Sequence, residues 1–145
     1  MNRERAAERF FGVAGGHVSK PGGPGTYKPD GPKPHKGIDV WAPPMSSVYV
    51  PLNADVLHII RTDYNARGQA FGWIDFCGIR YGIAMAHFAV EPIHGTYLPG
   101  AYIGRVAGRV PWTPHIHFAL ARTFIPPQEG RDNVDPLKVW RECAR

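Results

Sequence analysis

Two histidines one residue apart, His115 and His117, are the side chains best placed for metal or acid–base chemistry. Ile116, Phe118 and Leu120 form an apolar alternation around them. In a strand, both imidazoles therefore share the face opposite these apolar residues, with their backbones about 6–7 Å apart. Both can bind one metal ion, or one can bind it while the other addresses a bound water. A lone H-x-H motif arises often by chance, so further donors are needed.

A second pair of donors is His35 and Asp39, separated by three residues. A straight strand would hold them roughly 13 Å apart, too far to share an ion. A helix would bring them together, but Pro34 and Pro43 disfavour one. A bend at Gly37 solves the problem, because glycine tolerates backbone angles that other residues avoid. This segment therefore offers one nitrogen and one oxygen ligand.

The third element is His87, which ends an apolar strand. Two histidines and one carboxylate leave a fourth tetrahedral position for water, which is the pattern of catalytic rather than structural zinc. Zinc lowers the pKa of its bound water to roughly 7, and the surplus imidazoles can move protons. The remaining histidines of the chain are His17, His58 and His94.

Short strands must position these donors. The 145 residues include 17 Gly and 15 Pro, which favours turns and loops over long helices. Strands are predicted over residues 72–77, 82–87, 102–106 and 115–121, with a hairpin over 48–60 that turns at 53–55 and one helical turn over 135–141. We expect a mostly β, antiparallel single domain over residues 1–145, in which 1–11 form a short helix or arm.

Composition limits the classes of partner. The net charge of +5 favours polyanions, but no run of five Lys or Arg indicates a dedicated nucleic-acid patch. Cys77 and Cys143 form no metal motif, and the sequence leaves open whether they pair. The first residues lack the apolar core of a signal peptide, and no apolar run reaches about 18 residues. We therefore expect neither secretion by that route nor a transmembrane segment.

Three motifs in order make the sequence resemble the lysostaphin-type, or LytM-type, zinc endopeptidases of bacterial peptidoglycan. The motifs are His35-Lys-Gly-Ile-Asp39, Ala86-His87-Phe88 and Pro114-His115-Ile-His117-Phe118. Supporting segments are Ala42-Pro43, Val48-Tyr49-Val50, Leu98-Pro99-Gly100-Ala101-Tyr102-Ile103-Gly104 and Val134-Asp135-Pro136, so that the likeness covers roughly residues 9 to 140. The resemblance implies an antiparallel β fold whose loops line a groove over the metal.

Carried over by position, the resemblance implies one Zn²⁺ bound by His35, Asp39 and His117. His115 and His87 then occupy the positions of the family's unliganded catalytic histidines. One suits the general base that takes a proton from the zinc-bound water, and the other orients that water or stabilises the oxyanion. Which histidine has which role stays open.

The implied substrate is an extended, small-residue peptide of the cell wall, such as a glycine bridge or a D-Ala stem. Tyr27 and Trp112 are the aromatic candidates for substrate binding, and the Tyr27 hydroxyl could instead serve the oxyanion or only pack. The sequence departs from the family at Ala119, where an acidic residue is usual, and in the stiffer, aromatic loop 110–114. Action on the wall without a visible signal peptide predicts an enzyme carried in a phage particle or released at lysis, or a chain trimmed of its leader.

Three other classes of protein share part of this pattern. A non-catalytic peptidoglycan-binding or activator domain of this family would have lost metal ligands, which this chain retains. A cupin-like metal barrel also uses H-x-H, but it needs further ligands downstream, and no histidine follows His117. Glu91 and His94 match the E-x-x-H pair of another wall peptidase type, although that reading leaves H-x-H unexplained.

Overall fold

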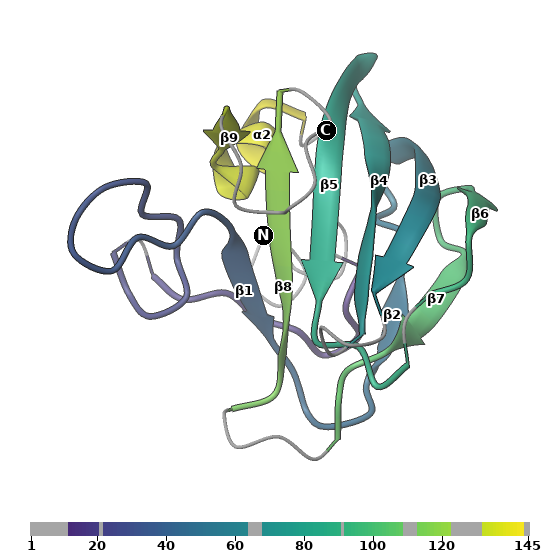
Figure 1. Ribbon diagram of the computed structural model, residues 1–145, viewed down its shortest axis with the longest axis horizontal. Coiled ribbons are helices and arrows are strands. Elements are labelled where there is room, and N and C mark those ends of the chain that lie inside the picture. Colours follow the sequence, from purple (N-terminus) through teal and green to yellow (C-terminus); the bar gives the residue numbers. More distant parts are fainter. Residues whose placement is uncertain are drawn as a thin grey trace.

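Two antiparallel β-sheets form the protein in a computed structural model that describes residues 12–20, 22–63, 68–90, 92–108, 113–122 and 132–143 (Figure 1). The larger sheet has the order β1-β8-β5-β4-β3-β6, with β9 beside β8, and the smaller one pairs β2 with β7. The strands are β1 (Ile38–Trp41), β2 (Ser47–Tyr49), β3 (Ala54–Asp63), β4 (Gln69–Phe76), β5 (Ile79–Ala86), β6 (Gly95–Tyr97), β7 (Tyr102–Arg105), β8 (His115–Ala121) and β9 (Asn133–Val134), followed by the helix α2 (Pro136–Cys143). The expected mostly antiparallel β fold is confirmed.

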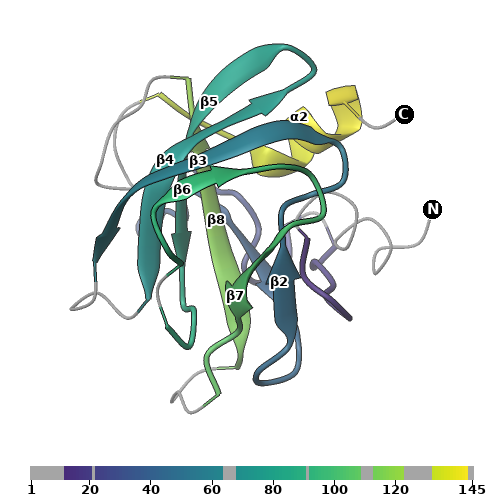
Figure 2. The same ribbon diagram turned by 90° about the vertical axis from the view of Figure 1, so that its right-hand side faces the viewer.

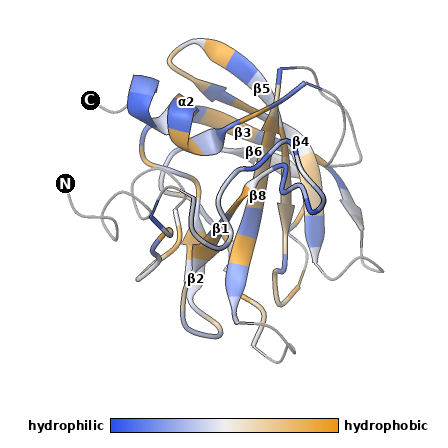
Figure 3. Cartoon of the chain, turned by 90° about the vertical axis from the view of Figure 1, so that its left-hand side faces the viewer, coloured by the Kyte–Doolittle hydropathy of each residue, from blue (hydrophilic) through white to orange (hydrophobic). Residues whose placement is uncertain are grey.

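Buried residues of both sheets form one core. Figure 2 shows β2 and β7 of the smaller sheet, with β8 of the larger sheet behind β7. Ile116, Phe118 and Leu120 point into the core from β8, and Val48 and Ile103 point into it from the smaller sheet. Burying an apolar side chain of this size stabilises a fold by about 1.5–3 kcal/mol. This burial fixes the face that β8 turns inward. The alternate residues of β8 must therefore face the other way, as its change between blue and orange illustrates in Figure 3.

The predicted hairpin over residues 48–60 is wrong. Its two strands exist as β2 and β3, but β2 pairs with β7, while β3 pairs with β4 and β6. The turn between them changes sheets instead of reversing the chain within one. Local sequence marks the turn, whereas the pairing partner is decided by tertiary packing.

The other predicted strands are confirmed, with β8 at the predicted bounds and β4, β5 and β7 within three residues of theirs. The predicted closing turn is the start of α2, which runs for 8 residues. The short strands β1, β6 and β9 were not predicted. The expected helix or arm over residues 1–11 lies outside the described residues.

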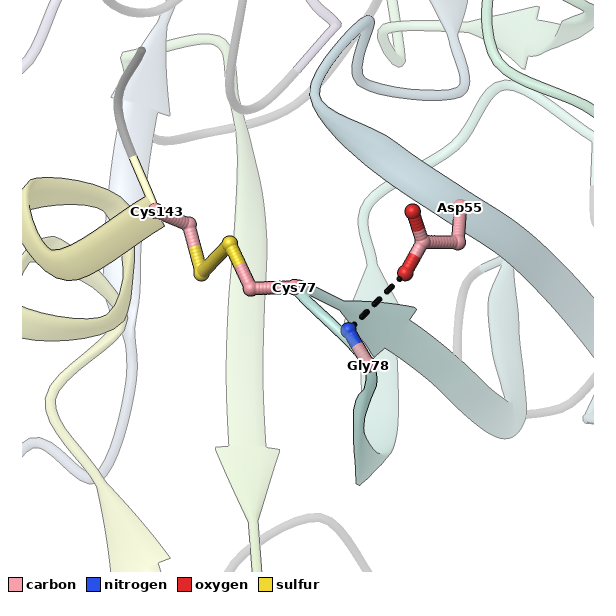
Figure 4. Close-up of a disulfide and its surroundings, with 4 residues drawn as sticks. All are labelled: Asp55, Cys77, Gly78 and Cys143. Carbon is pink, nitrogen blue, oxygen red and sulfur yellow. Dashed lines mark hydrogen bonds between the residues drawn. A yellow bond between two sulfur atoms is a disulfide. The ribbon is translucent and has the colours of Figure 1, made fainter.

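A disulfide joins Cys77, in the turn between β4 and β5, to Cys143 in the last turn of α2 (Figure 4). The two Cα atoms are 5.9 Å apart, within the usual range for a disulfide. The bridge links the C-terminal helix to the β4–β5 turn of the large sheet. It answers whether the two cysteines pair, which the sequence left open. No helix within the described residues is long and apolar enough to span a membrane.

Candidate metal centre

His35, Asp39 and His117 bring three ligand atoms together on the outer face of the large sheet. The Nδ1 atom of His117 lies 3.0 Å from Oδ1 of Asp39 and 3.1 Å from Nε2 of His35. The third separation, from His35 Nε2 to Asp39 Oδ1, is 3.3 Å. Among the described residues, this is the group of His, Cys, Asp and Glu side chains compact enough to hold a metal ion.

The pairing of β1 with β8 produces this convergence. Asp39 lies directly opposite His117 in the antiparallel register, so both side chains point to the same face. The chain bends at Gly37, as predicted, and this bend turns His35 back over the pair. The reason for glycine is space, because a Cβ atom there would collide with the Phe118 carbonyl oxygen and lie 2.9 Å from the His117 ring.

A backbone carbonyl decides which nitrogen of His35 carries the proton. The Nδ1 atom lies 3.0 Å from the carbonyl oxygen of Thr26, which can only accept a hydrogen bond. Nδ1 must therefore donate, and in the neutral ring the lone pair of Nε2 points at Asp39 and His117. Such a bond from the second nitrogen to a carbonyl is the usual support of a metal-binding histidine.

The three atoms fit a zinc ion. Bonds of about 2.0 Å to tetrahedral zinc place its ligand atoms roughly 3.3 Å apart, close to the separations observed here. Two imidazole nitrogens and a carboxylate oxygen are also donors that zinc accepts. Without a cation, one proton on His117 Nδ1 would have to serve both the Asp39 carboxylate and the lone pair of His35 Nε2. A divalent ion removes that conflict.

Asp39 is held in its charged form. Burial of the side chain tends to raise its pKa, but the hydrogen bond from His117 and the charges that the surrounding histidines can carry outweigh burial. The net effect lowers the pKa of Asp39 well below its usual value. The carboxylate is therefore ready to bind a cation at any pH near neutrality.

His115 lies beside the three ligand atoms but outside their triangle. Its Nε2 atom is 3.5 Å from Oδ1 of Asp39. Its Nδ1 atom lies 2.8 Å from the Thr113 carbonyl, so Nδ1 donates and Nε2 keeps a lone pair in the neutral ring. The indole of Trp41, opposite His115 in the register, packs on the imidazole with ring centroids 4.8 Å apart. The lone pair of His115 Nε2 is thus oriented toward the candidate metal position.

His87 completes the row of imidazoles from the end of β5. Its ring meets that of His115 edge to face, with centroids 4.7 Å apart. The backbone of His87 is left-handed, with φ of 76°, and its carbonyl accepts a hydrogen bond from the Ala107 amide. A non-glycine residue held in this conformation is uncommon and is often found at functional sites.

Comparison with solved structures identifies the architecture. The catalytic domain of the antimicrobial peptidase lysostaphin from Staphylococcus simulans aligns over 82% of this chain and 90% of its own, with a TM-score of 0.55 and 16% identity. The solution structure of lysostaphin gives 0.56 and 14% identity over 99% of this chain, which spans 54% of that protein. The chain has the lysostaphin-type fold. Protein-family models and curated sequences gave no match.

Within the lysostaphin-type fold, the structure describes only one of the two residues predicted to bind substrate, Tyr27. The Tyr27 hydroxyl donates a hydrogen bond to the carbonyl of Asn133 in β9, 3.0 Å away. Burial, with Asp135 and Asp30 nearby, raises the pKa of Tyr27. Trp112 lies outside the described residues.

Three further residues shape this candidate site and were not predicted from the sequence. The carbonyls of Thr26 and Thr113 orient two imidazoles, and Trp41 packs on His115. Backbone carbonyls leave no signal in a sequence. Trp41 could have been found, because it lies two residues beyond Asp39 and therefore on the same face of the strand.

Proposed function

We propose that the protein is a zinc endopeptidase that hydrolyses peptide cross-links or stem peptides of bacterial peptidoglycan. The observation that carries the proposal is the convergence of His35 Nε2, Asp39 Oδ1 and His117 Nδ1 within 3.3 Å of one another. The lysostaphin-type fold and the order of the three sequence motifs support it.

In this proposal His35, Asp39 and His117 would hold one zinc ion, which would supply a water of lowered pKa and polarise the scissile carbonyl. Nε2 of His115 would accept a proton from the attacking water, because the other ring nitrogen donates to the Thr113 carbonyl. His87, packed against His115, stabilises the protonated ring or the developing oxyanion.

The second candidate is a non-catalytic peptidoglycan-binding or activator domain. The retained set of three ligands and two further histidines favours the enzyme, since a binding module needs none of them. The disulfide also fits work outside reducing compartments, as cell-wall hydrolysis requires. Delivery by a phage particle stays a prediction from the sequence.

Digestion of purified cell wall tests the proposal. We expect the zinc-loaded protein to release muropeptides whose masses show new amino and carboxyl termini, and a chelator to stop the release until zinc is restored. The matched control is Asp39→Asn, which keeps the shape of the side chain but removes the anionic ligand. Stoichiometric zinc without any new termini would favour the binding module.

A further inference from the structure

The outer face of the small sheet carries an exposed pair of aromatic rings. Tyr49 in β2 lies opposite Tyr102 in β7, and their rings meet edge to face with centroids 6.0 Å apart. The two residues are 38% and 51% exposed, and Leu52 beside them is 63% exposed. Exposed apolar groups gathered in this way mark a binding surface more often than single exposed residues do. We call Tyr49, Tyr102 and Leu52 the tyrosine platform.

A cavity of about 340 Å³ opens beside Tyr49 and Leu52. It is lined by Gly12, Ala14, Tyr49, Val50, Leu52 and Gly100. None of these lining residues is charged. A pocket with apolar walls and a few polar groups at its rim is typical of small-ligand sites.

The tyrosine platform lies on the opposite side of the molecule from the histidines. Val48 and Ile103, next to the two tyrosines along their strands, point into the core, so Tyr49 and Tyr102 point away from it. On β8, Ile116 points into the same core while His115 and His117 point away. The tyrosine platform cannot, therefore, be part of the metal centre.

We propose that the tyrosine platform binds the glycan strand of peptidoglycan, a neutral chain of N-acetylated sugar rings. Each sugar ring has an apolar C–H face that stacks on an aromatic ring and a rim of hydroxyls that suits tyrosine. An acetamido methyl group fits the uncharged cavity. Charged stem peptides suit it poorly, because the cavity offers no ionic partner for them. The proposal rests on the proposed function in that the wall is the substrate.

Binding on this side would hold the enzyme to the wall while the opposite side acts on a peptide. Two linked contacts raise the effective concentration of the second, so the gain appears on intact wall and not on a soluble peptide. Comparing the cleavage rates of intact wall and of a soluble peptide therefore distinguishes the contribution of the tyrosine platform from that of the metal centre.

Titration of the zinc-loaded full chain with the β-1,4-linked tetramer of N-acetylglucosamine tests the proposal. Calorimetry and NMR monitor the binding. We expect saturable binding that shifts resonances of Tyr49 and Tyr102, and an affinity about tenfold lower in each of Tyr49→Ala and Tyr102→Ala, a loss typical of one aromatic contact. Ile79→Ala removes an apolar side chain that is 53% exposed elsewhere and serves as the control. Circular dichroism of each variant checks the fold.

Cleavage assays separate this inference from the proposed function. The two tyrosine variants should digest intact wall more slowly while cleaving a glycan-free cross-linked peptide at the normal rate. No cleavage of either substrate, together with tetramer binding, would reject the proposed function alone. Absence of tetramer binding, binding of stem peptides at these tyrosines, or concentration-dependent dimerisation through them would overturn the glycan site.

Discussion

At the level of single residues, backbone carbonyls determine which ring nitrogen of two histidines carries the proton, before any metal binds. His35 and His115 each donate from Nδ1 to a backbone carbonyl, at Thr26 and Thr113, so both present Nε2 lone pairs to the site. Yet Nε2 of His35 lies within 3.3 Å of Asp39 Oδ1, while that of His115 is at 3.5 Å and outside the triangle. The same ring state thus suits one histidine to binding and the other to proton transfer.

Substitution of the two histidines of the H-x-H motif should separate these roles. His117→Ala should lose both zinc and activity, because it removes one corner of the ligand triangle. His115→Ala should keep stoichiometric zinc and lose about 10²–10⁴-fold in kcat, the usual contribution of a general base. Zinc analysis and kinetics on a defined cross-linked peptide measure both. Loss of zinc from His115→Ala would show that the ligand assignment is wrong.

Tyr27 should make stability fall at high pH. Its pKa is raised by burial and by Asp135 and Asp30, so the folded protein holds the phenolic proton more tightly than the unfolded chain does. Its stabilising contribution is therefore complete below the usual value of 10.0 and is lost as the pH rises through the folded-state pKa. Urea unfolding between pH 8 and pH 11 should show a smaller loss of stability in Tyr27→Phe, and an equal loss would contradict this cause.

At the scale of elements, the site depends on how closely β1 approaches β8. Gly37 allows this approach, since a side chain there would meet the Phe118 carbonyl and the His117 ring. Gly37→Ala should push the two strands apart and weaken zinc binding, although it removes none of the five histidine and aspartate side chains of the site. Competition with a metal indicator measures the zinc affinity. Gly15→Ala is the control, because a Cβ atom at Gly15 meets nothing within 4 Å, although its φ of +67° adds some strain. Equal affinities in the two variants would argue against a steric role for Gly37.

The disulfide between Cys77 and Cys143 should stabilise the fold. Closing a loop with a sequence separation of 66 lowers the entropy of the unfolded chain and contributes about 4 kcal/mol in the chain-entropy model. The variant with both cysteines replaced by serine should have its unfolding midpoint at a correspondingly lower urea concentration. A reductant should destabilise the natural chain and leave the double variant unchanged. A reductant effect of the same size on both would rule out the bridge as the cause.

Elements with a strong local pattern could be predicted from the sequence, and those defined by their partner could not. β8 was found at its bounds because polar and apolar residues alternate over His115–Phe118 and Leu120 continues the apolar side. β1, with 4 residues, is fixed by pairing with β8, and β2 leaves its expected hairpin to pair with β7. The donors of the site could be proposed from motif and chemistry, whereas the carbonyls that orient them belong to loops whose path only tertiary structure decides.

At the scale of the whole molecule, one apolar core separates two outer faces with different chemistry. The residues of β8 that point inward share one core cluster with Val48 and Ile103 of the small sheet, so a close-packed interior lies between the histidines and the tyrosine platform. A close-packed core of this kind holds the two faces at fixed positions relative to each other. Changes on one face should therefore leave the other intact.

Zinc should stabilise the entire fold, because its ligands join parts of the chain that are 78 and 82 residues apart. Binding only to the folded state adds about 2.7 kcal/mol at a free zinc concentration of about 100 times Kd. For a domain of this size that is a rise in Tm of roughly 5–10 °C. Calorimetry with zinc and with chelator measures the shift, which should vanish in His117→Ala and persist in His115→Ala. The two tyrosine variants should retain the full shift, since the core isolates their face from the metal, and a reduced shift in them would show that the two faces are coupled.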